Sequence, residues 1–326
     1  MKNGLFNLVV CFLVSIIIAK PIIKWLKKLK FGQSILVYVE QHKSKSGTPT
    51  MGGIIIILSS IVGYLCFWKT NNMFATISIL SLLFFGLLGF LDDFIKIKFK
   101  HNEGLKPYQK IIGQLGLSII IAVYIYKSDI VGSEILIPFV NKNFDIGFWI
   151  IPFVVVFYLA VVNSVNLIDG LDGLCGKVTF VVLVVLSVLI YLLTKNYDSV
   201  YLNELNNIIV ITLGVAGAII GFLCFNVYPA KVFMGDTGSL ALGGFLASVL
   251  ALTKQYLIMF IIGAVYVLTT MSVIIQVGVF KLTKKRVFKM TPIHHHFENG
   301  NHESIVANVY MFVTIILGVM TIAMSL

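Results

Sequence analysis

The chain has 326 residues, of which 58% are hydrophobic and only 12% are charged, and its formal net charge is +11. Soluble domains average about 45–50% apolar and about 25% charged residues, so a soluble globule of this length would leave much apolar surface in water. The composition excludes a soluble enzyme and a disordered protein, and it indicates a polytopic membrane protein.

Ten apolar segments predict an all-α fold of ten membrane-spanning helices, forming a single domain over residues 1–326. A helix needs about 20 mostly apolar residues to cross a bilayer. The first segment lacks a signal-peptide cleavage site, so we expect it to be retained. The alternating residues from Ile135 to Phe144 predict a small hairpin at the membrane surface. The predicted spans are Leu5–Ile23, Met51–Trp68, Phe74–Leu91, Ile111–Tyr126, Phe148–Val162, Val178–Leu193, Ile208–Phe225, Leu240–Leu252, Tyr256–Val279 and Ile305–Met324.

Basic residues are unevenly divided between the two sides of this ten-span arrangement. Ten spans place both termini on one side, and the five loops on the other side carry 19 of the 25 Lys and Arg residues. Loops that face the cytoplasm are enriched in Lys and Arg. We therefore expect the five loops to be cytoplasmic and both termini extracytoplasmic. This topology explains the positive charge without a nucleic-acid partner.

The second of these loops begins with two adjacent carboxylates, Asp92 and Asp93, at the end of a predicted span. Carboxylates at membrane depth are costly and usually functional. Lys96 lies one helical turn away from both and is positioned to neutralise part of their charge. Taken alone, the pair also fits a solvated helix end with a surface ion pair.

The third loop carries Asn166, Asp169 and Asp172, which recur every three residues. If this segment is a helical turn, all three side chains lie on one face, and the interleaved glycines let a ligand approach the backbone. A polar connecting loop is the alternative. Together with the Asp92–Asp93 pair, these carboxylates favour a hard cation such as Mg²⁺, which prefers oxygen ligands and bridges phosphates.

The fourth loop contains Asp236 between small residues at the start of a predicted span. Backbone amides at such a helix start form an anion-binding site. Asp236 is either the helix N-cap or a metal ligand that faces a phosphate. The chain has no GxxxxGK[ST] segment, so this is not a P-loop.

The fifth loop contains three consecutive histidines, His294, His295 and His296. We expect an extended loop, in which neighbouring side chains point in different directions and at most two address one ligand. No cysteine is nearby and the spacing does not match zinc ligands on a helix. Phosphate or sugar recognition fits better than a metal, and a solvated loop is the alternative.

The combination of motifs is more specific than any one of them. TPTMGG, LDDFIK, NLIDGLDGL, FNVYPAKVFMGDTGSL and TPIHHHFE, in this order, closely resemble the phospho-N-acetylmuramoyl-pentapeptide-transferase family of the polyprenyl-phosphate N-acetylhexosamine-1-phosphate transferase superfamily. The resemblance spans nearly the whole chain, and the triple histidine marks this branch of the superfamily. The family's loop lysine corresponds to either Lys106 or Lys110.

The resemblance implies an Mg²⁺-dependent enzyme of the bacterial cell membrane with its active site facing the cytoplasm. Undecaprenyl phosphate, a membrane lipid, attacks the sugar-linked phosphate of UDP-N-acetylmuramoyl-pentapeptide, which gives lipid I and UMP. This is the first membrane step of peptidoglycan synthesis. The chemistry needs charge neutralisation and positioning, which Mg²⁺ and lysines supply. We expect a homodimer and no nucleic-acid partner.

The resemblance also implies roles for individual residues. Asp236 is the expected Mg²⁺ ligand, Asp92 the base that deprotonates the lipid phosphate, and Asp93 an assistant to the metal or to Lys96. We favour direct attack over a double displacement through Asp236. The residues expected to contact the uridine diphosphate are Asn166, Asp169, Asp172 and Phe233. Those expected to hold phosphates or the muramoyl group are Lys45, Lys96, Asn226, His294, His295 and His296.

Two alternative functions remain. A UDP-N-acetylglucosamine-1-phosphate transferase shares most of these motifs, but it lacks the triple histidine and prefers another sugar nucleotide. An ion-coupled transporter would also have ten spans and membrane-proximal acids. Its acids would lie near the bilayer midplane between broken helices, whereas here they are grouped in the cytoplasmic loops.

Overall fold

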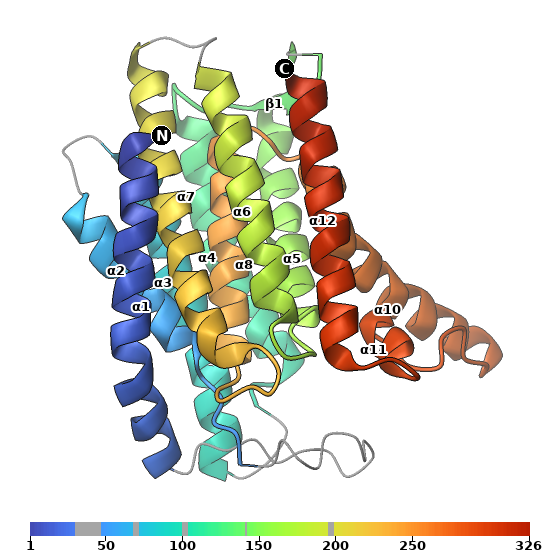
Figure 1. Ribbon diagram of the computed structural model, residues 1–326. Coiled ribbons are helices and arrows are strands. Elements are labelled where there is room, and N and C mark those ends of the chain that lie inside the picture. The colour runs from blue at the N-terminus through green and yellow to red at the C-terminus, as the bar shows by residue number, and fades with distance from the viewer. Residues whose placement is uncertain (30–46, 68–71, 100–103, 141, 195–198) are drawn as a thin grey trace.

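The computed structural model describes residues 1–29, 47–67, 72–99, 104–140, 142–194 and 199–326. Within these residues the chain is mostly helical, as Figure 1 shows. The helices are α1 (Lys2–Lys28), α2 (Gly53–Cys66), α3 (Met73–Phe99), α4 (Pro107–Lys127), α5 (Ile150–Leu167), α6 (Leu174–Leu193), α7 (Ser199–Asn226), α8 (Gly235–Leu252), α9 (Met259–Ile262), α10 (Ala264–Thr283), α11 (Ile293–Glu298) and α12 (Glu303–Ser325), with the 3₁₀ turn η2 (Gly147–Trp149).

Nine helices in the described ranges are long and apolar enough to cross a bilayer, which supports the prediction of a polytopic all-α membrane protein. The other predicted span corresponds to α2, which has only 14 residues. At about 1.5 Å per residue it is roughly 21 Å long, less than the roughly 30 Å of a hydrocarbon core.

Several predicted span boundaries are wrong, and two of these differences change the architecture. The helix predicted to end at Leu91 continues as α3 to Phe99, so the carboxylate pair lies within a helix and not in a loop. The predicted span Tyr256–Val279 is divided into the short α9 and the longer α10 by Gly263. A Cβ at Gly263 would lie 2.6 Å from the carbonyl oxygen of Met259, so a larger residue does not fit this break.

The central helix of the bundle is α8, which is buried from Thr237 to Leu252. It packs against α3 and α5, while α1 packs along α7. The outer helices α1 and α12 expose large apolar side chains such as Phe6, Ile17 and Phe312. An apolar exterior around a helical bundle, in which each helix satisfies its own backbone, is what a lipid environment requires.

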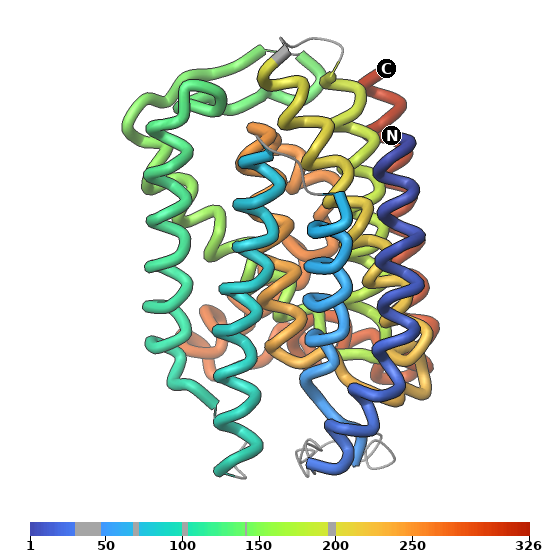
Figure 2. The backbone as a smooth tube through the Cα atoms, turned by 90° about the vertical axis from the view of Figure 1, so that its left-hand side faces the viewer, coloured from blue at the N-terminus to red at the C-terminus, as the bar shows by residue number. Residues whose placement is uncertain are grey.

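The predicted hairpin is confirmed at one end of the bundle. Strands β1 (Glu134–Ile137) and β2 (Lys142–Asp145) pair in antiparallel fashion. The Lys254 ammonium lies 2.7 Å from the Glu134 carboxylate, and the Leu136 N–H donates to the Lys254 carbonyl, so the hairpin is fixed to the end of α8. Both chain termini lie at this same end (Figures 1 and 2).

Candidate active site

Two predicted motifs that are far apart in sequence form one structural unit at the end of the bundle opposite the hairpin. The Gly52 N–H donates to the Phe233 carbonyl at 2.8 Å, and the Gly53 N–H donates to the Met234 carbonyl at 3.0 Å. The Phe233 N–H in turn donates to the Pro49 carbonyl at 2.8 Å. The TPTMGG segment therefore fixes the backbone just before α8, which carries Asp236.

Glycines allow the helices around this unit to approach closely. A Cβ at Gly89 of α3 would overlap the backbone carbonyl of Asp236, and a Cβ at Gly53 of α2 would overlap the backbone of Gly238. Small residues at helix contacts permit this spacing in membrane proteins. The acidic residues of α3 and α8 are thus held together by main-chain packing.

Asp93 is buried and binds the start of α8. Its Oδ2 accepts hydrogen bonds from the Thr237 N–H at 2.9 Å and the Thr237 hydroxyl at 2.7 Å, and its Oδ1 accepts from the Asp236 N–H at 3.2 Å. A carboxylate at a helix N-terminus satisfies free N–H groups and complements the helix dipole. The contacts of Asp93 therefore position α8, whereas Lys96 pairs with Asp92 and Asp236.

Two lysines bridge the carboxylates of Asp92 and Asp236. Lys96 Nζ lies 2.6 Å from Asp92 Oδ2 and 2.9 Å from Asp236 Oδ2. Lys110 Nζ lies 3.0 Å and 2.6 Å from the same two oxygen atoms. The ambiguity between two loop lysines is thereby resolved in favour of Lys110, because Lys106 is exposed at the N-cap of α4.

Asp92 and Asp236 each have a further partner. Asp92 Oδ1 accepts a hydrogen bond from the Leu105 N–H at 2.8 Å. Asp236 Oδ1 accepts from Asn166 Nδ2 at 2.8 Å, and Asn166 also donates to the Ser239 hydroxyl at 2.9 Å. Asp236 lies in the first turn of α8, whose N-cap is Met234, so the N-cap interpretation of Asp236 is wrong.

The prediction that Asn166, Asp169 and Asp172 share one helical face is wrong, because α5 ends at Leu167. Asn166 points toward Asp236, but the Asp172 carboxylate accepts a hydrogen bond from the Ala230 N–H at 2.9 Å. Asp172 therefore joins the third motif to the fourth loop.

Asp169 is half-buried, and no described residue donates a hydrogen bond to its carboxylate. Burial is the main cause that raises its pKa to about 8, and the charges of Asp236, Asp93 and Asp172 add to this effect. A carboxyl group with such a pKa is largely protonated at neutral pH. Asp169 is thus an acid without a cationic partner in the described part of the chain, close to the lysine-bridged pair.

The two predicted ligand residues of the fourth loop differ in their contacts. Asn226 is buried and its Nδ2 donates to the Val232 carbonyl at 2.9 Å, so this amide closes its own loop. Phe233 is half-buried, and its main chain is fixed by the TPTMGG segment. Lys45, a predicted phosphate ligand, lies outside the described residues.

The three histidines lie in the short helix α11, so the prediction of an extended loop is wrong. His295 Nδ1 is 2.7 Å from the Glu298 carboxylate, and His296 Nδ1 accepts a hydrogen bond from the Lys289 N–H at 3.2 Å. The side chains nevertheless have different partners. His294 packs against Gly170 of the third motif, where a Cβ would overlap its Nε2.

His294 is buried, and neither of its ring nitrogens has a hydrogen-bond partner in the described structure. Burial, with the adjacent His295, lowers its pKa to about 3, so the ring is neutral at physiological pH. A neutral imidazole has one donor and one acceptor nitrogen. In His294 neither nitrogen is satisfied by a described residue.

Sequence patterns did not identify three further residues of this end of the bundle. Thr237 and Ser239 belong to a recognised motif, and their contacts to Asp93 and Asn166 depend on the fold. Glu303 accepts a hydrogen bond from the Asp172 N–H at 3.3 Å. Its only signal in the sequence is a charge at the start of the last apolar segment.

The donor set at the α3–α8 contact suits a divalent cation. Carboxylate oxygens of Asp92, Asp93 and Asp236 all lie within 4.8 Å of one another. Asp93 is engaged by N–H and hydroxyl groups of α8, whereas the Oδ2 atoms of Asp92 and Asp236 face two ammonium groups. Mg²⁺ is commonly bound through one or two carboxylates together with substrate phosphates.

Comparison with known proteins agrees with this geometry. The Glycosyl transferase family 4 model matches residues 75–254, and the phospho-N-acetylmuramoyl-pentapeptide-transferase signature 1 matches residues 45–57. A phospho-N-acetylmuramoyl-pentapeptide-transferase of Clostridium novyi (strain NT) is 45% identical over 319 residues, covering 97% of this chain and 95% of the relative. The relative of the same name from Clostridioides difficile (strain 630) is 43% identical over 317 residues, covering 96% and 94%.

The matched regions contain the residues that form the site. Signature 1 includes the TPTMGG segment that fixes the start of α8, and the family model includes both carboxylates that the lysines bridge. With relatives of this identity aligned over nearly its whole length, the chain belongs to the phospho-N-acetylmuramoyl-pentapeptide-transferase family.

Proposed function

We propose that this protein transfers phospho-N-acetylmuramoyl-pentapeptide from its UDP-activated form to undecaprenyl phosphate, giving lipid I and UMP. The names of its relatives support this reaction. The observation that carries it is the pair Asp92 and Asp236, each within 3.0 Å of Lys96 and Lys110. Two ammonium groups placed next to two carboxylates suit the binding of a diphosphate.

Asp236 is the proposed Mg²⁺ ligand, and Asp92 lies close enough to share the ion. Bound Mg²⁺ would neutralise charge on the diphosphate and on the leaving UMP. Lys96 and Lys110 are then free to contact phosphate oxygens as point charges. Asp93 keeps these groups in place through its bonds to the first turn of α8.

Asp92 is the proposed base for the lipid phosphate. An ionised phosphate oxygen is an adequate nucleophile, so we favour its direct attack on the sugar-linked phosphorus. One P–O bond forms as the bond to UMP breaks. Asn166 holds Asp236 through a hydrogen bond of 2.8 Å, which orients the carboxylate without taking part in the transfer.

The nucleotide and sugar are assigned to the surrounding loops. Asp169 and Asp172 with Phe233 are proposed to contact the uridine diphosphate, and the half-buried Phe233 ring is available for base stacking. His294 to His296 are proposed to contact phosphate or the muramoyl group together with Lys45. Asn226 shapes this surface through its bond to Val232.

The side of the membrane on which the reaction takes place is inferred from the distribution of Lys and Arg residues. The five loops that include the site motifs carry most of the Lys and Arg residues, so we propose that they face the cytoplasm in a ten-span, single-domain protein of the bacterial cell membrane. A homodimer is part of this proposal.

A cysteine introduced at Lys285 should react with impermeant reagent only from the cytoplasm, and one at Asn143 only from outside.

Release of UMP by the purified protein tests the reaction. We expect UMP from UDP-N-acetylmuramoyl-pentapeptide only when undecaprenyl phosphate and Mg²⁺ are present, and little from UDP-N-acetylglucosamine. Preference for UDP-N-acetylglucosamine would support the other transferase class. Absence of UMP from both substrates would reject the proposal.

A further inference from the structure

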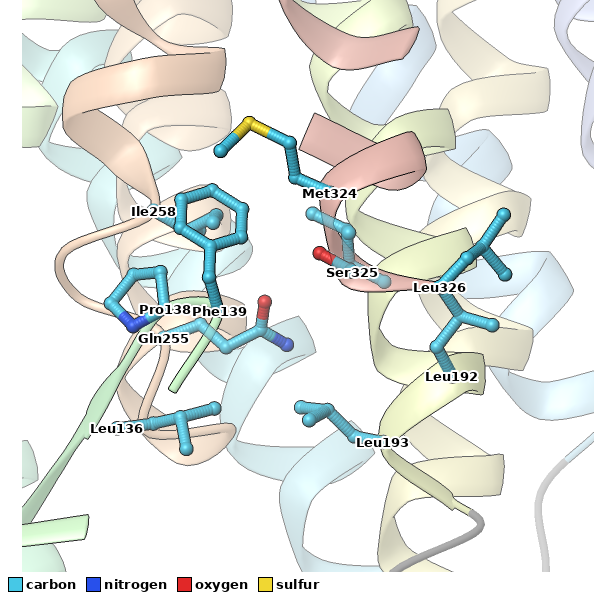
Figure 3. Close-up of a pocket in the computed structure, with 11 residues that line it drawn as sticks. Leu136, Pro138, Phe139, Leu192, Leu193, Gln255, Ile258, Met324, Ser325 and Leu326 are labelled. Carbon is cyan, nitrogen blue, oxygen red and sulfur yellow. The ribbon is translucent and has the colours of Figure 1, made fainter. Parts of the chain in front are cut away.

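A cavity of about 220 Å³ lies at the hairpin end of the bundle, far from the lysine-bridged carboxylates. Figure 3 shows it between the ends of α6 and α12, the β1 segment and the link from α8 to α9. Nine of its eleven lining residues have apolar side chains. None of them belongs to the candidate active site.

One polar side chain in this cavity has an unpaired donor. Gln255 is 5% exposed, and its Nε2 atom makes no hydrogen bond within the described structure. In Figure 3 its amide extends from the α8–α9 link toward the ends of α6 and α12. Buried amide groups in native proteins are nearly always hydrogen-bonded. The unpaired donor therefore points to an acceptor that the described residues do not supply.

Two of the apolar side chains that line the cavity are exposed. Met324 is 61% exposed and Phe139 is 38% exposed, and both line the cavity. The helices α6 and α12 end here, at Leu193 and Ser325, after spans long enough to cross a bilayer. The cavity therefore opens near the depth at which a bilayer changes from hydrocarbon to polar groups.

We propose that this cavity binds the acyl-ester portion of a bilayer phospholipid. The ester carbonyl accepts a hydrogen bond from Gln255 Nε2, and the first carbons of the acyl chain pack against Leu189, Leu192 and Ile258. Ester groups lie at the interfacial depth, and an ester offers an acceptor next to an apolar chain, which matches one amide donor next to apolar side chains.

The size of the cavity is consistent with part of a lipid. An apolar cavity of about 150 Å³ accommodates a benzene molecule, so this one accommodates roughly nine carbon atoms. A buried water molecule typically needs about three hydrogen-bond partners. The other polar side chain here, Ser325, already donates to the Thr321 carbonyl at 2.8 Å, so its hydroxyl proton is not available to an occupant.

A pair of lipids that differ only at the ester group tests the proposal. Native mass spectrometry would measure retention of diester phosphatidylglycerol and of its diether analogue, which lacks the carbonyl, by the purified full-length protein. One neutral hydrogen bond predicts a preference of about two- to tenfold for the diester. Gln255→Leu should abolish this preference and leave diether retention unchanged.

Steric variants of α6 provide the matched control. Leu192→Trp fills the cavity and should reduce retention of both lipids, whereas Tyr191→Trp, on the exposed side of α6, should behave as wild type. Size-exclusion profiles check that each variant is folded. If Leu192→Trp fails this check, the Gln255→Leu comparison decides alone. Equal retention of the two lipids by wild type, or a preference that persists in Gln255→Leu, would overturn the proposal.

Discussion

The α3–α8 contact and the α10–α11 segment lie at the same end of the bundle but are held in different ways. At the α3–α8 contact, glycines bring main chains together and Asp93 makes three hydrogen bonds to the start of α8. Helix α10 projects from the bundle in Figure 1, and the segment is attached through side chains, such as the Thr270 hydroxyl of α10, which donates to the Ser164 hydroxyl of α5 at 2.7 Å.

The two ways of holding these regions suit two different functions, phosphoryl transfer and substrate recognition. Phosphoryl transfer needs charges held to within fractions of an ångström, because a displacement of about 1 Å can cost about a hundredfold in rate. Recognition of a large sugar–peptide tolerates more adjustment. We infer that the α3–α8 contact determines the rate of transfer, whereas the histidine segment determines the binding of the sugar nucleotide.

The largest expected effect is at Asp92. The second pKa of a phosphate is about 6, so a base matters most at low pH. Loss of a general base typically costs about 10²–10⁴ in rate. We expect Asp92→Asn to show such a loss near this pH, with partial rescue in alkaline solution. Measurement of UMP release as a function of pH tests this prediction.

Asp93→Asn is the matched comparison for Asp92→Asn. Its carboxylate binds α8, so we expect a loss of activity that alkaline solution does not rescue, together with a lower melting temperature. Loss of a helix cap typically costs about 1 kcal/mol. If the two variants show the same flat pH profile, Asp92 is not the base.

Gly89→Ala should reduce transfer by about a hundredfold. The new methyl group would overlap the Asp236 carbonyl and force α3 and α8 apart. The control is Gly116→Ala in α4, where a Cβ meets no atom within 4 Å. Kinetics and thermal unfolding of both variants would be measured, and wild-type activity in Gly89→Ala would show that the close contact is not needed.

A smaller effect is expected at Gly170. Gly170→Ala should push the His294 ring away, because a Cβ there would overlap Nε2 of His294 and lie 3.0 Å from Nε2 of His295. Loss of one or two hydrogen bonds should raise KM for the sugar nucleotide by about tenfold, with little change in kcat. Gly278→Ala, where a Cβ has open space, is the control. A fall in kcat alone would assign the histidines to the chemical step.

The smallest effect concerns Asp169 and stability. Its folded pKa is raised to about 8, so the native state holds a proton that the unfolded chain releases above about pH 4. The stability of the protein should therefore decrease as the pH rises through this window. In metal-free protein at pH 8, Asp169→Asn should raise the melting temperature by about 1–3 °C, and the gain should vanish in acid. A gain that is equal at both pH values would contradict the raised pKa.

Much of the fold could be predicted from sequence because hydropathy and length alone identify a helix that crosses a bilayer. The alternation of apolar and polar residues from Ile135 to Phe144 predicted the hairpin. The continuation of α3 beyond Leu91 could not be predicted from hydropathy, because Asp92 and Lys96 are charged. They are accommodated in the helix through partners on other helices, including Asp236 and Lys110.

The candidate site was predicted as a set of motifs but not as a set of contacts. Asp93 and Thr237 are 144 positions apart, so no local spacing indicates that one caps the helix of the other. The spacing of Asn166, Asp169 and Asp172 suggested a shared face, but the helix ends between the first and the second residue. Periodicity predicts neighbours within an element, whereas this site is made between elements.

The most direct test of the central claim is the binding of Mn²⁺, as a paramagnetic substitute for Mg²⁺, to the purified protein without substrate. Electron paramagnetic resonance measures the free ion. We predict that wild-type protein and Asp145→Asn, a variant at the hairpin end, bind a single Mn²⁺ ion equally well, and that Asp236→Asn binds it at least about tenfold more weakly. Equal binding by Asp236→Asn and wild type would contradict a metal site at the α3–α8 contact.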